Sequence, residues 1–233
     1  MKKNILRGTY KVILLFSKTF FYYLKSLLHK ERVLEFKQKW AQNSLAEFGY
    51  EFIEIGPRPN SDQGLILVGN HISFLDIMVL MSVSPKITFV AKKEVRRWPI
   101  IGVSAARVGT IFVDRNPSAD RKKVRAEMAE QIQKKAAYVT VFPSGTTSLV
   151  ENKTWKKGIF EVAKEYAVPV QAFKLQYEPL RESAFIDDDG LLSQMYALFG
   201  IKNKKVILTW LGEFPVDDPL VSAEKIRSYI ENY

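Results

Sequence analysis

The strongest constraint on the fold is an apolar stretch that ends in a polar turn and continues into a second apolar segment. Residues 64–69 run Gly-Leu-Ile-Leu-Val-Gly, the turn at 70–76 runs Asn-His-Ile-Ser-Phe-Leu-Asp, and residues 77–80 are apolar again. The first stretch predicts a buried strand and the last a helix. Strand, turn and helix in this order are typical of α/β domains, which place sites beyond the carboxyl ends of strands.

The turn contains His71, one of only two histidines in the chain, and Asp76 follows five residues later. On a continuous helix that spacing would rotate the two side chains by roughly 140°, so they could not meet. They can meet if the helix begins between them, with Ser73 as N-cap and Asp76 in the first turn. Asp76 would then orient the imidazole through one nitrogen and leave the other free to accept a proton.

A purely structural interpretation of the same residues stays open. Ser73 and Asp76 also match a capping box, with His71 as an ordinary turn residue, and short matches arise by chance. Three further segments bear on the choice. They are a strand-like run ending in a charged pair at 109–115, a strand-like run entering a glycine-containing turn at 141–148, and the start of another apolar strand at 167–170.

Together these four blocks resemble the glycerolipid acyltransferase family, whose best-known members are the 1-acylglycerol-3-phosphate (lysophosphatidic acid) acyltransferases. The resemblance covers about residues 65–175 and includes the HX4D motif formed by His71 and Asp76. It implies transfer of a fatty acyl chain from acyl-coenzyme A or acyl-carrier protein to the hydroxyl of a lyso-glycerolipid. The first acceptor that it implies is 1-acylglycerol-3-phosphate, giving phosphatidic acid, with Arg115 at the acceptor phosphate.

The third block departs from the family pattern Phe-Pro-Glu-Gly-Thr-Arg-Ser. Ser144 replaces the glutamate and Thr147 replaces the arginine, which removes a bidentate phosphate donor that threonine cannot imitate. Two alternatives therefore stay open: an acyltransferase for another lysophospholipid or lyso-lipid, and a non-catalytic lipid-binding relative. The residues expected to bind substrate are Asn70, Ser73, Arg115, Gly145, Thr146, Thr147 and Ser148.

The expected mechanism uses no cofactor, no metal and no acyl-enzyme. His71 acts as general base on the acceptor hydroxyl, which is worth about 10²–10⁴-fold in rate, and Asp76 fixes its tautomer. Backbone N–H groups around Gly145 are the expected oxyanion donors, because glycine allows close approach of the chain to a ligand. The chain has no cysteine, which excludes thiolate nucleophiles and cysteine-ligated metals.

The first 50 residues carry ten Lys and Arg against three acids, within a chain of net charge +10. They are also rich in Phe, Tyr and Leu, and Lys11, Lys18 and Lys25 recur every seven residues, on one side of a helix. This pattern favours an interfacial helix whose ammonium groups meet anionic lipid head groups, over a spanning helix or a signal peptide. A helix that simply packs on the domain is the alternative.

The remaining chain predicts an α/β domain with a mixed central sheet flanked by helices on both faces. We expect a membrane-anchoring helical pair at 1–50, with its second helix near 31–48, and an acyltransferase domain at 51–233. Strands are expected near 51–55, 64–69, 87–91, 110–114, 138–142, 169–176 and 204–210. Helices are expected near 73–83, 118–136, 157–166, 191–199 and 219–231.

The expected partners are anionic membrane lipids, the acyl thioester donor and the lyso-lipid acceptor, at the cytoplasmic face of a membrane (the inner membrane in a bacterium). Basic runs such as 92–97 and 121–125 carry no nucleic-acid motif, so no nucleic-acid partner is expected. The acidic run 187–189 lacks the ligand spacing of a calcium loop and is expected to be a solvated turn.

Overall fold

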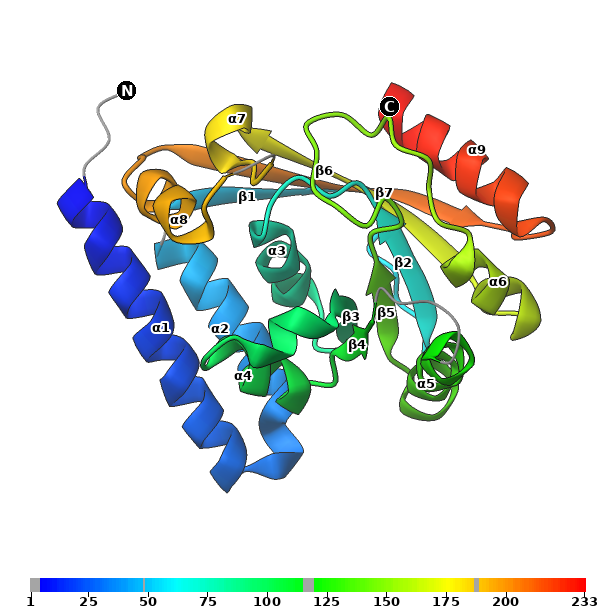
Figure 1. Cartoon of the computed structure of the whole chain (residues 1–233), viewed down its shortest axis with the longest axis horizontal. Helices are drawn as coiled ribbons and strands as arrows, with labels where there is room; N and C mark the ends of the chain where they lie inside the picture. Colours follow the sequence, from blue (N-terminus) through cyan, green and yellow to red (C-terminus); the bar gives the residue numbers. More distant parts are fainter. Residues whose placement is uncertain (1–4, 48, 115–119, 187–188) are drawn as a thin grey trace.

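A seven-stranded sheet in the order β1-β7-β6-β2-β5-β3-β4 runs through the molecule (Figure 1). The computed structural model describes residues 5–47, 49–114, 120–186 and 189–233. All neighbouring strands are parallel except β6 and β7, which confirms the mixed sheet. The strands are β1 (Tyr50–Ile55), β2 (Leu65–Gly69), β3 (Ile87–Lys92), β4 (Ile111–Val113), β5 (Tyr138–Val141), β6 (Val170–Glu178) and β7 (Lys204–Phe214).

Helices cover both faces of the sheet, as the alternation of elements predicts (Figure 1). One face packs against α1 (Ile5–Leu28), α2 (Val33–Glu47), α3 (Leu75–Val83) and α8 (Leu191–Phe199), and the other against α5 (Asp120–Lys135), α6 (Gly158–Glu165) and α9 (Pro219–Asn232). Strand β2 shows why its sequence is continuously apolar. Leu65 and Leu67 belong to the first core, Ile66 and Val68 to the second, and all four are fully buried.

Every strand and every longer helix expected from the sequence is present, with boundaries shifted by at most four residues, the largest shift being at the end of β7. The structure also contains short helical segments that the sequence does not predict. They are the 3₁₀ helices η1 (Lys30–Arg32) and η2 (Lys93–Arg97), and the helices α4 (Ile101–Arg107) and α7 (Leu180–Ser183). Segments of one or two turns carry too few residues for a helical period to emerge.

The lysines of α1 do not form the expected outward ridge. Lys11 is buried and donates to the carbonyl of Glu47 at the end of α2, and Lys18 pairs with the carboxylate of Glu47. Only Lys25 is exposed, with its ammonium 4.7 Å from the centre of the Phe21 ring. The spacing places the lysines on one face of the helix, but most of that face turns toward α2. There a carbonyl and a carboxylate oxygen accept hydrogen bonds from the ammonium groups.

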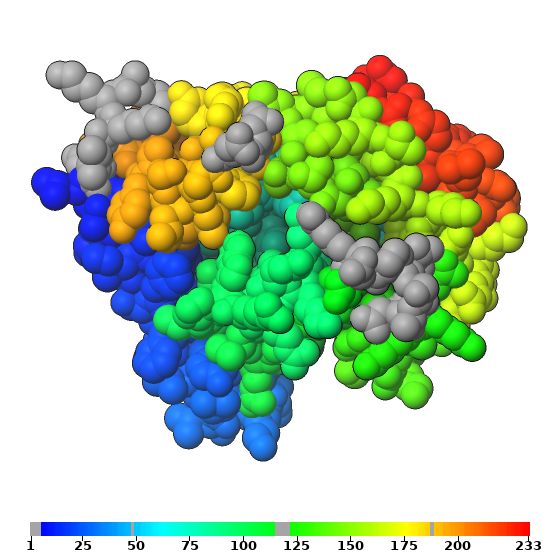
Figure 2. All heavy atoms as spheres, viewed as in Figure 1, coloured from blue at the N-terminus to red at the C-terminus, as the bar shows by residue number. Residues whose placement is uncertain are grey.

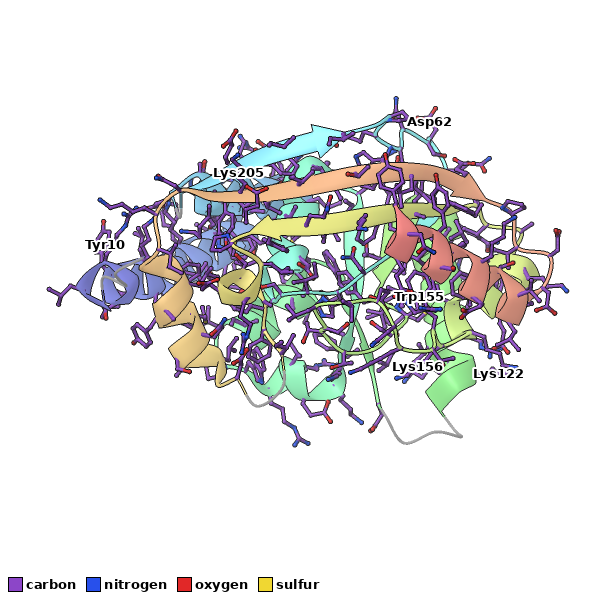
Figure 3. All side chains as sticks on the ribbon, turned by 90° about the horizontal axis from the view of Figure 1, so that it is seen from above. Tyr10, Asp62, Lys122, Trp155, Lys156 and Lys205 are labelled. Atoms are coloured by element: carbon purple, nitrogen blue, oxygen red, sulfur yellow. The ribbon has the colours of Figure 1, made fainter. Side chains whose placement is uncertain are left out.

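The outer face of α1 is instead apolar. We call this set the apolar stripe: Leu6, Tyr10, Ile13, Phe20, Phe21, Leu24, Leu27 and Leu28, all exposed. Tyr10, which is 63% exposed, marks this helix at the edge of the molecule in Figure 3. Among the helices that the structure describes, none is both long enough and apolar enough to cross a bilayer.

Candidate functional site

His71 and Asp76 meet as their spacing predicts. Nδ1 of His71 lies 2.7 Å from Oδ2 of Asp76, whose side chain is fully buried, and the His71 side chain is 19% exposed. Because Asp76 engages Nδ1, it favours the tautomer in which Nε2 carries the free lone pair. The pair therefore has the geometry of an oriented general base.

The prediction that Ser73 is the N-cap of this helix is wrong, because the N-cap is Phe74. Helix α3 begins at Leu75 rather than after Ser73, and Ser73 accepts a hydrogen bond from the Leu75 N–H at 3.3 Å. The carboxylate of Asp76 folds back over the turn and accepts from the backbone N–H groups of Ile72 at 2.7 Å and Ser73 at 3.0 Å. Asp76 thus closes the turn and holds the imidazole with one carboxylate.

Tyr177 on β6 also engages Asp76. Its hydroxyl donates to Oδ1 of Asp76 at 2.6 Å, so both carboxylate oxygens have partners. Burial raises the pKa of Tyr177 well above its ordinary value, and the negative charge of Asp76 raises it further. Tyr177 is therefore a neutral phenol that donates to the carboxylate at any physiological pH.

The loop that follows β5 holds His71 from the other side. The Phe142 ring stacks on the imidazole with a centroid distance of 4.0 Å and an interplanar angle of 10°. The backbone N–H of Ser148 donates to the His71 carbonyl at 2.8 Å. The third sequence block thus contacts the first, and His71 has little freedom to rotate.

A cavity of about 1180 Å³ extends from His71 into the protein. Its inner part is mainly apolar and is lined by residues of α1, α2, α3 and β3, among them Phe16, Tyr22, Phe36, Met78 and Phe89. Figure 2 shows the surface hollowed between the segment near residues 95–105 and the loop after β5. A cavity of this size and character suits a long apolar group.

The end of the cavity near His71 is polar and basic. Gly145, Thr146 and Thr147 line it, and the cavity lining also includes the basic side chains of Lys92, Arg125 and Lys156. Arg125 pairs with Glu161. Gly145 has a φ of 71°, a left-handed conformation that favours glycine, and the side chain of Lys156 lies beside it.

The structure separates the expected substrate-binding residues into three groups. Gly145, Thr146 and Thr147 line the cavity beside His71. Asn70, Ser73 and Ser148 are absent from the lining. The Asn70 amide pairs with the backbone of Leu175 on β6 through hydrogen bonds of 2.8 and 2.7 Å, so it joins β2 to β6. Arg115 lies outside the described residues, as do Asp187 and Asp188 of the acidic run.

Sequence reasoning missed Tyr177, which holds Asp76 from β6. Tyr177 is separated from Asp76 by 101 positions, and nothing near it in the sequence marks it as a partner. Within the described ranges, no cluster of three or more His, Asp or Glu side chains is arranged to hold a metal ion.

Comparison with known proteins identifies the family of the chain. A family model described as Acyltransferase matches residues 50–175, which contain His71, Asp76 and the loop after β5. The fold and the match together define the class: the chain belongs to the acyltransferase family.

Particular relatives differ in the acceptor that their names give. The lyso-ornithine lipid O-acyltransferase of Pseudomonas aeruginosa is 32% identical over 181 residues, which are 76% of this chain and 68% of the relative. The 1-acyl-sn-glycerol-3-phosphate acyltransferase of Neisseria gonorrhoeae is 32% identical over 127 residues, 54% of this chain. The match spans only about half (49%) of the Neisseria protein.

The fold is also that of a solved structure. The crystal structure of the 1-acyl-sn-glycerophosphate (LPA) acyltransferase from Thermotoga maritima superposes with a TM-score of 0.70 at 18% identity, over 98% of this chain and 90% of that one. At this identity the likeness supports the α/β fold with its N-terminal helices, and nothing finer.

Proposed function

We propose that this protein is a membrane-associated O-acyltransferase that moves a fatty acyl chain from an acyl thioester to the hydroxyl of a lyso-lipid. The observation that carries the proposal is the oriented His71–Asp76 pair at the polar end of a long, mainly apolar cavity. Family membership supports the reaction type. The donor is acyl-coenzyme A or acyl-carrier protein, since both present the same thioester.

In the proposed reaction, Nε2 of His71 takes the proton from the acceptor hydroxyl as the oxygen attacks the thioester carbonyl. The new carbon–oxygen bond forms, the carbon–sulfur bond breaks, and the imidazolium returns the proton to the departing thiolate. Asp76 stabilises the imidazolium through Nδ1. The N–H of Gly145 donates to the carbonyl of Phe142 at 2.9 Å within its turn, so the proposed oxyanion donors are the next two N–H groups, of Thr146 and Thr147.

The polar end of the cavity supports a proposal for the acceptor. Thr147 lines it at the position where the family pattern has an arginine, so a phosphate monoester loses a bidentate partner there. This observation favours a lyso-lipid with another head group, such as the lyso-ornithine lipid named for the Pseudomonas relative. The second candidate is 1-acylglycerol-3-phosphate, which the basic side chains around the same end and the Neisseria relative support.

We further propose that the apolar stripe of α1 inserts into the head-group region of an anionic membrane. Exposed Phe, Leu and Ile side chains on a basic N-terminal segment are typical of interfacial helices. The lysines on the inner face then contribute through the overall positive field rather than by direct contact. The division into an anchor at 1–50 and an acyltransferase domain at 51–233 stays a proposal, since α1 and α2 share the core of α3 and α8.

The decisive experiment is acyl transfer from a long-chain acyl-coenzyme A, and from the matching acyl-carrier protein, to a panel of lyso-lipids. The panel includes lyso-ornithine lipid and lysophosphatidic acid, and each is assayed with wild type, His71→Ala and His29→Ala. His29 is the other histidine and is exposed at the end of α1, so its variant controls for loss of an imidazole. We expect product that falls at least about 100-fold in His71→Ala and is unchanged in His29→Ala.

Either of two results would overturn the proposal. Transfer that persists in His71→Ala would remove His71 as the base. No transfer with either donor, combined with retained binding of lipid vesicles, would identify a non-catalytic lipid-binding relative.

A further inference from the structure

Lys156 lies at the end of the loop between β5 and α6, directly after Trp155 (both are labelled in Figure 3). Trp155 is buried in the second core and stacks on Phe160 of α6, with ring centroids 6.1 Å apart. The backbone N–H of Lys156 donates to the carbonyl of Pro143 at 3.0 Å. The backbone that carries this lysine is therefore fixed both to the core and to the first turn after β5.

The ammonium group of Lys156 lies over Gly145. A Cβ built on Gly145 would be 2.7 Å from Nζ, 3.3 Å from Cε and 3.9 Å from Cδ of Lys156. The end of the lysine side chain thus takes the space that the glycine leaves open. Lys156 is an exposed residue, but the last part of its side chain lies against this turn.

The turn at Gly145 belongs to the end of the cavity that contains His71. Gly145, Lys156 and His71 all line the cavity. The loop that contains Gly145 reaches His71 at two points, because Phe142 stacks on the imidazole at 4.0 Å and the N–H of Ser148 donates to the His71 carbonyl at 2.8 Å. The ammonium therefore lies against the same loop that holds the proposed base.

Lys156 differs from the neighbouring cations in its partners. Arg125 and Lys157 both pair with Glu161, and the nitrogen–oxygen distance for Lys157 is 3.3 Å. Among the residues that the structure describes, the Lys156 ammonium has neither a carboxylate partner nor a hydrogen bond. A cation that lines a cavity and has no protein partner there is available to an anionic ligand.

The family pattern places its arginine two positions after Gly145, where this chain has Thr147. Lys156 brings a positive charge to the same turn from a different position in the sequence. An ammonium is a compact point charge with three donors, and unlike a guanidinium it does not require two oxygens in one plane. Lysine at this point therefore suits a carboxylate as well as a phosphate.

We infer that Lys156 binds the anionic group of the acceptor head group, and that the acceptor is a lyso-lipid with a carboxylate or a phosphate near the hydroxyl that is acylated. This inference rests on the proposed function and names the class of acceptor for the same site. Both candidate acceptors fit, since lyso-ornithine lipid carries the carboxylate of ornithine and lysophosphatidic acid carries a phosphate monoester. Monoacylglycerol has the apolar part of lysophosphatidic acid without the anionic group, so it should bind weakly.

The test uses Lys156→Met, which keeps the length of the side chain and removes the charge, and Lys156→Arg, which restores a cation. The matched control is Lys157→Met. It removes one positive charge from the next position, which is exposed and is not among the described residues that line the cavity. All proteins are assayed in micelles of a neutral detergent, so that attraction to a charged membrane does not contribute. Thermal unfolding confirms that each variant is folded.

The first readout is equilibrium binding of each lyso-lipid without donor, which needs no turnover. We expect Kd for lyso-ornithine lipid and lysophosphatidic acid to rise about tenfold or more in Lys156→Met, and to stay within about twofold of wild type in Lys157→Met and Lys156→Arg. Monoacylglycerol should bind all four proteins equally. Raising the salt concentration should weaken binding of the anionic lipids to wild type more than to Lys156→Met. Equal Kd values for Lys156→Met and wild type would overturn the inference.

The second readout is turnover. In Lys156→Met we expect KM for the anionic acceptor to rise about tenfold, with KM for acyl-coenzyme A changed less than about twofold. A rise in the donor KM alone would instead assign the ammonium to the phosphate of the phosphopantetheine arm, and would overturn the inference.

The two proposals fail in different ways. If binding depends on Lys156 but wild type transfers no acyl chain from either donor, the proposed function fails and the head-group contact stands. If transfer depends on His71 but neither Kd nor the acceptor KM responds to Lys156→Met, the proposed function stands and the role of Lys156 fails.

Discussion

The phenol of Tyr177 donates to Oδ1 of Asp76 at 2.6 Å, while Oδ2 of the same carboxylate holds His71. The aspartate is therefore fixed from the sheet side by β6 and from the turn side by its own N–H partners. Because the other partners of Asp76 all contact Oδ2, the Tyr177 hydrogen bond to Oδ1 fixes the carboxylate at its second oxygen and helps to aim the imidazole.

Replacing Tyr177 with Phe removes that anchor. We expect a loss of about 1.5–3 kcal/mol in the free energy of unfolding, the usual range for a hydrogen bond to a charged group, and a fall in kcat of about tenfold. Chemical denaturation and acyl transfer assays measure the two effects. Tyr138→Phe is the control, since its hydroxyl bonds to the backbone of Ser61 away from the site, so it should lose stability and keep kcat.

Restoring the family arginine tests the acceptor. In Thr147→Arg we expect the kcat/KM ratio for lysophosphatidic acid over lyso-ornithine lipid to rise about tenfold or more, because a guanidinium binds a phosphate monoester through two hydrogen bonds. The added preference should weaken as salt is raised. Thr154→Arg, an exposed change in the same loop, adds the same charge and should leave the ratio unchanged. An unchanged ratio in Thr147→Arg would contradict the placement of the acceptor head group.

The apolar stripe makes a prediction about membrane binding. The triple variant Ile13→Gln, Phe20→Gln and Leu24→Gln alters exposed positions that do not line the cavity. We expect its partitioning onto vesicles with anionic lipid to fall about tenfold or more, because apolar side chains no longer enter the interface. Vesicle co-sedimentation measures the loss. Changing the exposed Leu220 and Val221 of α9 to Gln is the control, and equal losses in both proteins would argue against the stripe.

Lys37 predicts a pH dependence of stability. Its ammonium is buried and donates to the carbonyls of Pro85 and Ile87, and burial lowers its pKa from 10.5 to about 7. Between pH 7 and 10.5 the unfolded chain keeps a proton on this group that the folded chain has lost, so the contribution of Lys37 to stability rises with pH, by up to about 1.4 kcal/mol per unit.

Lys37→Met removes that dependence. The free energy of unfolding of wild type relative to Lys37→Met should increase as pH rises through this window, and urea titrations at pH 7, 8.5 and about 10 would measure it. A difference that is constant across the window would show that the buried group does not titrate there.

The first block was predictable because its key contact is local. His71 and Asp76 are five residues apart, so helix geometry alone decides whether they meet, and the strand before them is recognisable by composition. The seven strands and the longer helices are likewise marked by local composition and spacing. The contact of Tyr177 with Asp76 depends on which strand lies beside the turn, and no periodicity in the sequence indicates that neighbour.

The orientation of α1 shows a different limit. The seven-residue spacing of Lys11, Lys18 and Lys25 correctly places them on one side, but the sequence does not reveal whether that side faces inward. The deciding partner for the first two is Glu47, which α2 presents to α1 with both its carbonyl and its carboxylate. A lysine ammonium with such partners is stable between α1 and α2, and the apolar stripe of α1 is left on the outer surface of the molecule.

The position of α1 has one more consequence. Its outer face is the apolar stripe, and its inner face, with Leu15, Phe16 and Tyr22, forms one wall of the cavity. A single helix about 10 Å across is all that separates the two. The two faces of the same 24-residue helix therefore set the affinity for a membrane surface and the volume left for an acyl chain. A change in the direction of the helix axis alters both properties together.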